Sequence, residues 1–219
     1  RMKVAITVEE AVALIPDGAS VMLSGFMGVG VPDRIVNALA EAGRKDLTLI
    51  TNDTAVPGRG PGPLIHAGAV TKIICSHMGK SPETQAKVLA GEIEAELNPQ
   101  GTFVERVRAA GVGLGGILTP TGVGTTVSEY METVEVDGRK FLLGKPIRAD
   151  FALISAWRCD YVGNLSYTMS ARNFNPIMAM AADTVIVEPH EIVPVGMISP
   201  DDVDTPGALV DHIVQRNNH

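Results

Sequence analysis

Short hydrophobic runs alternate with amphipathic stretches along most of the chain. The runs are rich in Val, Ile, Leu and Ala, and they fall at residues 20–23, 47–50, 72–76, 93–97, 152–156 and 184–187. Short apolar runs of this kind, bounded by turn residues, are typical of buried strands. We therefore expect each of these six segments to be a strand.

Helix signals lie between the strand-like runs. Thr7 and Glu10 have the spacing of a capping box, Pro32 suits the first turn of a helix, and Ser81 precedes a Pro-Glu pair that favours a helix start. A further helix is expected over residues 102–110. Strands that alternate with helices predict βαβ units with right-handed crossovers, and hence a parallel sheet.

One segment breaks this alternation. Residues 133–136 and 140–143 are both strand-like and flank an Asp-Gly pair, which is a strong hairpin signal. We predict an α/β fold, a three-layer, open and mostly parallel sheet with helices on both faces and an inserted antiparallel hairpin. With no repeat and no linker composition, residues 2–219 are expected to form a single domain.

Composition excludes several classes of function. The 219 residues carry a net charge of −7 and no basic tract, so we expect neither a nucleic-acid partner nor an anionic membrane. An anionic ligand would need local donors, because the overall charge opposes it. No apolar run approaches the length of a membrane span, and the N-terminus lacks the apolar core of a signal peptide. We predict a cytoplasmic protein that starts at Met2, with Arg1 as a cloning remnant.

Cysteine and histidine patterns do not indicate a metal site. Cys75 and Cys159 are far apart and show no CxxC spacing, which favours two reduced thiols. The histidines form no close ligand pair, so we expect no metal and no permanently bound cofactor. His77 follows a predicted strand and could line a cleft, although a lone histidine is more often structural.

A glycine loop after the first strand is a candidate ligand site, and it comprises Ser24, Gly25, Phe26, Met27, Gly28, Val29 and Gly30. Its Gly-x-x-Gly-x-Gly spacing matches a dinucleotide fingerprint only loosely. Glycines let backbone N–H groups approach an anion, and the next helix is expected to turn its positive N-terminus toward the ligand. By spacing alone, a tight turn without a ligand is an equally good interpretation.

Polar residues follow two later strands. Asn52 and Asp53 end the strand at 47–50, and Gln100 follows the strand at 93–97. In open α/β sheets the carboxyl ends of strands form the ligand crevice, where a neutral amide can donate a hydrogen bond to developing negative charge. Each of these residues, taken singly, is also explained as a loop cap.

The sequence contains no motif that indicates a hydrolase. The chain has no Gly-x-Ser-x-Gly elbow, and no carboxylate stands out as a buried nucleophile. Glu92, Glu94 and Glu96 alternate along a strand pattern and therefore share one face, which we interpret as solvated.

Several ordered motifs match one known pattern. They lie at residues 17–32, 47–54, 98–102, 115–125 and 170–176. Together they resemble the family I coenzyme A transferases in their α-subunit form. The family pattern has two glycines before the phenylalanine of the loop, and this chain has Ser24 at the first of them. Within that family, the motifs of this chain look most like those of bacterial acetate/acetoacetate/butyrate transferases, with succinate-using 3-oxoacid transferases as an alternative.

The resemblance implies a mechanism shared between two chains. In such families a glutamate attacks an acyl-CoA, forms an acyl anhydride and then an enzyme–CoA thioester, and a second carboxylate takes the CoA. The glutamate lies in the β subunit, in a Ser-Glu-Asn-Gly-like motif that this chain lacks. The resemblance also implies that Asn52 and Gln100 stabilise oxyanions, that residues 24–30 bind coenzyme A as a substrate, and that the enzyme is an α2β2 heterotetramer.

Two other classes of function stay open at this point. A sugar-phosphate isomerase or deaminase on a similar fold would need an acid/base carboxylate pair and basic phosphate ligands, and neither is found in convincing spacing. A non-catalytic module that binds a CoA-type ligand is the second alternative. If a β subunit is present, residues 57–63 and 111–124 are candidates for its interface, because both border strand ends.

Overall fold

The computed structural model describes residues 2–216, and its centre is one large, mostly parallel sheet. Neighbouring strands follow the order β11-β10-β8-β1-β2-β3-β4, all paired in parallel, and the short β9 pairs antiparallel with β8. The strands are β1 Ser20–Leu23, β2 Leu47–Thr51, β3 Val70–Cys75, β4 Glu94–Leu97, β8 Ala149–Asp160, β9 Leu165–Ser166, β10 Ala182–Val193 and β11 His212–Ile213.

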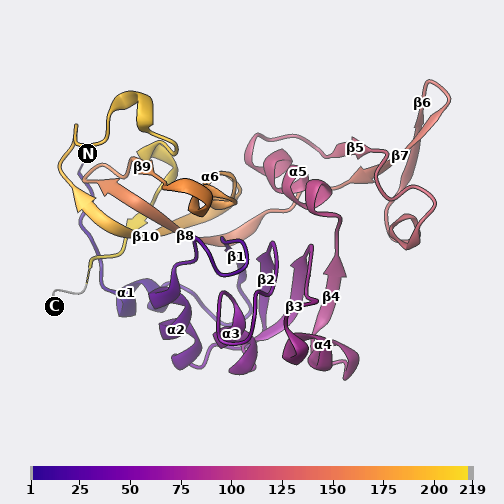
Figure 1. Ribbon diagram of the computed structural model, residues 1–219, viewed down its shortest axis with the longest axis horizontal. Coiled ribbons are helices and arrows are strands. Elements are labelled where there is room, and N and C mark those ends of the chain that lie inside the picture. Colours follow the sequence, from indigo (N-terminus) through magenta and orange to yellow (C-terminus); the bar gives the residue numbers. More distant parts are fainter. Residues whose placement is uncertain (1, 217–219) are drawn as a thin grey trace.

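Helices cover both faces of this sheet, as the sequence predicts (Figure 1). One face carries α1 Val8–Ala13, α2 Asp33–Glu41, α3 Gly62–His66 and α4 Pro82–Leu89, and the other carries α5 Gln100–Gly111 and α6 Asn175–Met178. Short 3-10 helices lie at Thr126–Glu129, Met169–Arg172, Pro200–Asp202 and Gly207–Leu209. Within the described residues, no helix is long and apolar enough to cross a membrane.

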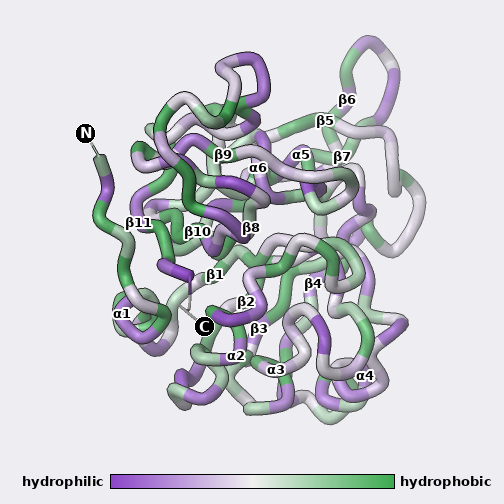
Figure 2. Tube along the Cα trace, turned by 60° about the vertical axis from the view of Figure 1, so that its left-hand side comes forward, coloured by the Kyte–Doolittle hydropathy of each residue, from purple (hydrophilic) through white to green (hydrophobic). Residues whose placement is uncertain are grey.

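Side chains of successive strand residues enter two different cores. Val21 and Leu23 of β1 belong to the core beneath α1–α4, whereas Met22 between them belongs to the core beneath α5 and α6. Strand residues alternate between the two faces of a sheet, so a strand covered on both faces needs apolar residues at every position. Figure 2 shows the resulting hydrophobic colouring along the central strands, while α1 and α4 carry both colours.

The predicted hairpin is present and belongs to a second, smaller sheet. Strands β6 Thr133–Val136 and β7 Arg139–Gly144 pair antiparallel, and β5 Ile117–Thr119 pairs with the other edge of β7. The turn has φ of 52° at Asp137 and 74° at Gly138, as a two-residue hairpin of this type requires. Figure 1 shows this hairpin extending away from the large sheet.

The starts of α1 and α4 follow the predicted signals, while helices α3 and α6 and strands β5, β9 and β11 were not predicted. Thr7 and Glu10 form the complete capping box of α1, and the Ser81 side chain caps α4. Helix α3 was not expected, because its five residues lie at the end of a Gly- and Pro-rich segment. The assignment of residues 2–219 to a single domain stays a prediction.

The order of the strands creates a switch point at β1. The chain proceeds from β1 outward through β2, β3 and β4, and then returns to place β8 on the other side of β1. In open α/β sheets the crevice for a ligand lies outside the carboxyl ends of the strands at such a reversal. The glycine loop follows β1 directly and therefore lies at this point.

Candidate active site at the carboxyl edge of the sheet

Asn52 and Gln100 meet at the carboxyl edge, although 48 positions separate them in the sequence. Gln100 Nε2 donates to Asn52 Oδ1 at 3.0 Å, and Ser76 Oγ lies 2.8 Å from the same oxygen. These residues follow β2, β3 and β4 in turn, so parallel pairing brings three strand ends together. Asn52 Nδ2 donates to the carboxylate of Asp53 at 2.7 Å, which fixes the orientation of its amide.

The two amides differ in exposure. Asn52 is only 1% exposed, while Gln100 is exposed at the first turn of α5. An amide nitrogen carries two hydrogens, and the bond to Asn52 uses one of those on Gln100. Gln100 is therefore the more exposed member of this pair, and one of its amide hydrogens is left over for a ligand. The oxyanion roles of Asn52 and Gln100 stay predictions.

Asp53 joins the amide pair to the glycine loop. Its carboxylate, in a residue only 4% exposed, accepts hydrogen bonds from Met27 N at 3.0 Å and from Ala55 N at 2.8 Å. With the Asn52 amide as a third donor, the buried charge is well satisfied. The sequence placed Asp53 at a strand end but gave no sign of its contact with Met27, 26 residues away.

The glycine loop is a tight turn with an apolar tip. Phe26 and Val29 exchange two backbone hydrogen bonds of 2.9 and 3.0 Å, and Met27 and Gly28 between them have φ of 50° and 82°. The side chains of Phe26 and Val29 point outward, with 47% and 44% exposure. A loop of this form can present apolar contacts to a ligand.

One serine and two asparagine side chains hold the rest of this loop. Ser24 Oγ donates to the Gly30 carbonyl at 3.0 Å, and Asn175 Nδ2 donates to the same oxygen, also at 3.0 Å. Asn173 Nδ2 donates to the Val29 carbonyl at 2.9 Å. In the sequence, residues 170–176 stand out only as one of the motifs that carry the family resemblance. The structure adds a physical reason for its asparagines, because they fix the loop from the far end of the chain.

The expectation that helix α2 offers a free, positive N-terminus to a ligand is wrong. Glu188 of β10 already occupies that end, because its carboxylate accepts from Arg34 N at 3.3 Å and from Ile35 N at 2.9 Å. Burial raises the pKa of Glu188, and the Ile35 amide and the Arg34 charge oppose that rise. An anionic ligand at the glycine loop must find its donors elsewhere.

Cys75 and His77 show no sign of being nucleophiles. The Cys75 thiol is buried, and this burial, opposed by a hydrogen bond with the His77 backbone and reinforced by the Asp53 charge, raises its pKa to about 12. A thiol with such a pKa is protonated at neutral pH and unreactive. His77 is exposed beside Asp53 at the edge of the sheet. Within residues 2–216, no group of three or more His, Cys, Asp or Glu residues is placed to hold a metal ion.

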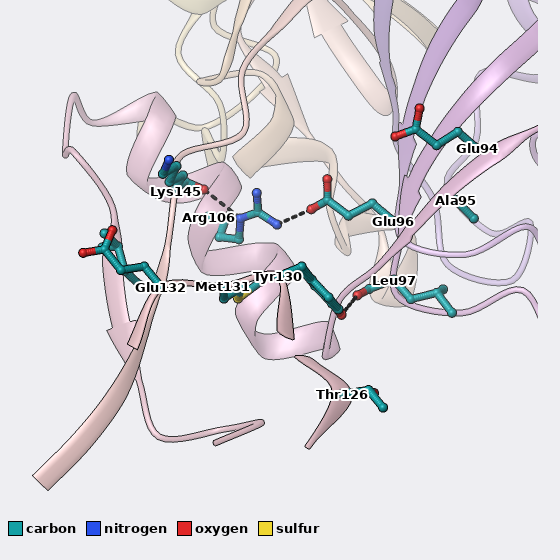
Figure 3. A pocket seen from close by; sticks show the side chains of 11 residues that line it. Glu94, Ala95, Glu96, Leu97, Arg106, Thr126, Tyr130, Met131, Glu132 and Lys145 are labelled. Carbon is teal, nitrogen blue, oxygen red and sulfur yellow. Dashed lines mark hydrogen bonds and ion pairs between the residues drawn. The ribbon is translucent and has the colours of Figure 1, made fainter. Parts of the chain in front are cut away.

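A cavity of about 620 Å³ lies on the other side of β4, next to the small sheet (Figure 3). Arg106 of α5 reaches into it and pairs with Glu96 at 2.6 Å, while its Nε donates to the Lys145 carbonyl at 2.7 Å. The solvated face predicted for the glutamates is therefore wrong for Glu96, which is half-buried in an ion pair. Arg106 also bonds Asn98 Oδ1 at 2.5 Å and so ties down the turn that leads to Gln100.

The Glu96–Arg106 pair should make part of the stability depend on pH. Burial by itself would raise the pKa of Glu96, but the hydrogen bond and charge of Arg106 and the Asn98 amide lower it below the ordinary 4.5. The ionised form therefore stabilises the fold above pH 4.5, and this contribution is lost as the pH falls through the lowered pKa.

Glu96→Gln should reduce the free energy of unfolding at pH 7 by about 1 kcal/mol, a value discounted for partial exposure. The difference from the wild type should shrink in acid, as measured by urea unfolding at a series of pH values. Glu94→Gln is the matched control, because Glu94 pairs with Lys72 at an exposed position. Equal losses for both variants, or a loss at Glu96 that persists in acid, would contradict the assignment.

The fold and this edge define a class of protein. It is an α/β protein whose parallel sheet presents a glycine loop and a buried amide–carboxylate network at its switch point. The chain belongs to the coenzyme A transferase family, since the family model described as Coenzyme A transferase matches residues 5–216.

Known CoA-transferase subunits and structures resemble this chain over most of its length. The chain is 53% identical over 209 residues to the acetate CoA-transferase subunit alpha of Escherichia coli K12, covering 95% of each chain. It is 42% identical to the acetoacetyl-CoA:acetate/butyrate CoA transferase alpha subunit of Clostridium acetobutylicum, covering 96% of each. Its fold matches an acyl-CoA transferase from E. coli O157:H7, solved as a thioester complex with CoA, with a TM-score of 0.89 and 26% identity. The match covers 100% of this chain and 48% of that longer one.

Proposed function

We propose that this chain is the α subunit of a heteromeric CoA-transferase. The enzyme moves coenzyme A between a short-chain acyl-CoA, such as acetoacetyl-CoA, butyryl-CoA or acetyl-CoA, and a carboxylate such as acetate. One observation carries the proposal, namely the contact of Gln100 with Asn52 beside the glycine loop at the switch point. The named α subunits among its relatives support the choice of substrates.

In this proposal the chain supplies one wall of a shared active site. A glutamate of the partner attacks the thioester carbonyl, and the bond to sulfur breaks to release CoA thiolate and an acyl anhydride. The thiolate then attacks the glutamyl carbonyl of the anhydride, which releases the first carboxylate and leaves a glutamyl-CoA thioester. An acceptor carboxylate takes the CoA by the reverse steps, so no oxidant, reductant or permanently bound cofactor takes part.

Each tetrahedral step places negative charge on a carbonyl oxygen. The free N–H of Gln100 is the donor from this chain that reaches that oxygen, and Asn52 orients it from behind. Such preorganised donors stabilise the transition state more than the ground state. Residues 24–30 contact coenzyme A through the exposed side chains of Phe26 and Val29, on a loop whose backbone Asp53 and Asn173 hold in place.

The partner is a β subunit, in an α2β2 assembly located in the cytoplasm. The Ser-Glu-Asn-Gly-like motif that carries the nucleophile is absent from this chain, so the chain alone should be inactive. The coverage of only 48% of the solved acyl-CoA transferase chain leaves room there for a second half, which is compatible with a two-subunit arrangement here. The interface segments at 57–63 and 111–124 stay predictions.

Reconstitution tests this function. The chain and a β-type subunit are expressed separately, and CoA transfer from acetoacetyl-CoA to acetate is assayed for each and for the mixture. Activity in the mixture only supports the proposal, and borohydride reduction of the trapped thioester should label the β chain. Activity of this chain alone, no activity in the mixture, or a label on this chain would overturn it.

A succinate-using 3-oxoacid CoA-transferase is the second candidate. It would catalyse the same transfer with a dicarboxylate as substrate, and the second carboxylate of that substrate requires a cationic group near the acyl pocket. The same mixture is assayed with acetate and with succinate as acceptor. A higher kcat/KM for succinate favours this second candidate, and a higher kcat/KM for acetate favours the first.

A further inference from the structure

Several backbone amides at the glycine loop and at the start of α2 are already occupied, and the overall charge opposes an anion. Coenzyme A carries phosphates and the acceptors carry carboxylates, yet the chain has a net charge of −7. The amide of Met27 already bonds Asp53, and the first amides of α2 already bond Glu188. A cation close to the loop would therefore favour the binding of an anionic group there.

Arg59 is placed over this loop. If Gly28 carried a Cβ atom, that atom would lie 3.3 Å from Arg59 Cβ and 3.5 Å from Arg59 Nε. The absence of a side chain at Gly28 thus leaves room for the arginine, in addition to allowing the positive φ of the turn. Arg59 is itself exposed, so its guanidinium can meet a ligand from solvent.

The segment that carries Arg59 is constrained. Pro57 and Pro61 flank it, Arg59 N donates to the Val56 carbonyl at 3.1 Å, and Gly62 N donates to the Arg59 carbonyl at 2.9 Å. Proline lowers the number of backbone conformations, so the backbone of this turn has less freedom to lose when a ligand binds.

Arg59 also differs from most arginines of the chain in having no partner within residues 2–216. A carboxylate within 4.0 Å pairs with Arg34, Arg106, Arg108, Arg148, Arg158 and Arg172. Arg59 interacts with Asp33 only through its charge, without a hydrogen bond. Burial raises the pKa of Asp33, and the charge of Arg59 opposes that rise. An exposed, unpaired guanidinium on a constrained turn is available for an oxyanion.

We propose that Arg59 binds an anionic group of a substrate at the glycine loop, through the two parallel hydrogen bonds that a guanidinium makes with a phosphate or a carboxylate. This inference deepens the proposed function and rests on it. The group is either a phosphate of coenzyme A or the second carboxylate of a dicarboxylic acceptor. The first source makes Arg59 a determinant of acyl-CoA affinity, and the second makes it a determinant of acceptor choice.

Arg59→Gln and Arg59→Lys in the reconstituted enzyme test the proposal. Loss of the guanidinium should raise one KM about 10- to 100-fold while kcat changes little, and lysine should recover part of the loss. A phosphate ligand predicts a higher KM for acetoacetyl-CoA with every acceptor. A carboxylate ligand predicts a higher KM for succinate and an unchanged KM for acetate.

Arg148→Gln is the matched control, because Arg148 is an exposed arginine just before β8 that pairs with Asp183. It should leave every KM unchanged. Wild-type KM values in Arg59→Gln would overturn the proposal. So would weaker association of the two subunits by gel filtration, which would assign Arg59 to a carboxylate of the partner.

The activity of the wild-type mixture distinguishes a wrong role for Arg59 from a wrong function for the enzyme. If the wild-type mixture is active and Arg59→Gln matches it, only the role of Arg59 is lost. If the wild-type mixture is inactive, calorimetric titration of CoA and of succinate into the mixture still tests Arg59. Binding of either one that weakens in Arg59→Gln supports the role, and equal or absent binding in both forms overturns it.

Discussion

Gln100→Ala should lower kcat of the reconstituted enzyme about 100- to 1,000-fold, the usual effect of removing one oxyanion donor. The alanine variant loses the exposed N–H that faces the developing charge. Asn52 Oδ1 keeps its bond from Ser76, and Asn52 Nδ2 keeps its bond to Asp53, so the rest of the network stays satisfied. Because the lost interaction forms in the transition state, KM should change far less than kcat. Steady-state kinetics with acetoacetyl-CoA and acetate measure both constants.

A control separates this effect from a structural one. Gln215→Ala removes an exposed glutamine near the end of the described chain and should leave kcat unchanged. Thermal unfolding of Gln100→Ala should match that of the wild type within about 1 kcal/mol, because Gln100 is exposed. A wild-type kcat, or a fall in kcat that follows a large loss of stability, would remove Gln100 from the reaction.

Asp53→Ala should have the second large effect, and it should act on stability and activity together. The substitution leaves Met27 N, Ala55 N and Asn52 Nδ2 without their acceptor in a buried place. We expect a loss of about 3 kcal/mol in the free energy of unfolding, because unsatisfied buried donors are costly. The glycine loop and the amide pair should both lose their fixed positions, so kcat should fall at least tenfold even where the protein is folded.

Asp53→Asn tests the same contact without creating a cavity. Its amide keeps one acceptor oxygen but turns an NH2 group toward the donors at the other position, so it should be intermediate in both readouts. Asp150→Asn is the matched control, since Asp150 also accepts from a backbone amide and a hydroxyl of Ser20, but at an exposed position. If Asp53→Asn is as stable and active as Asp150→Asn, Asp53 does not position the site.

The helix N-terminus illustrates where prediction from a glycine loop fails. Loop and helix were both predicted correctly, and the general rule assigns an anion site to such an N-terminus. Glu188 occupies it from a strand 154 positions away in the sequence from Arg34. No local pattern marks Glu188 as the partner, because the contact depends on where β10 lies in the sheet.

The sequence by itself determined the elements of this protein and the family it resembles. Periodicity, caps and the Asp-Gly turn are local properties, and they indicated six strands of the large sheet, four helices and the hairpin, but not the short strands β5, β9 and β11. Tertiary structure alone decided the strand order, and with it the switch point at β1, the contact of Gln100 with Asn52, and the position of Arg59 over Gly28. Such contacts join residues from separate strands and loops, and their free energy depends on distances that only the packed sheet sets.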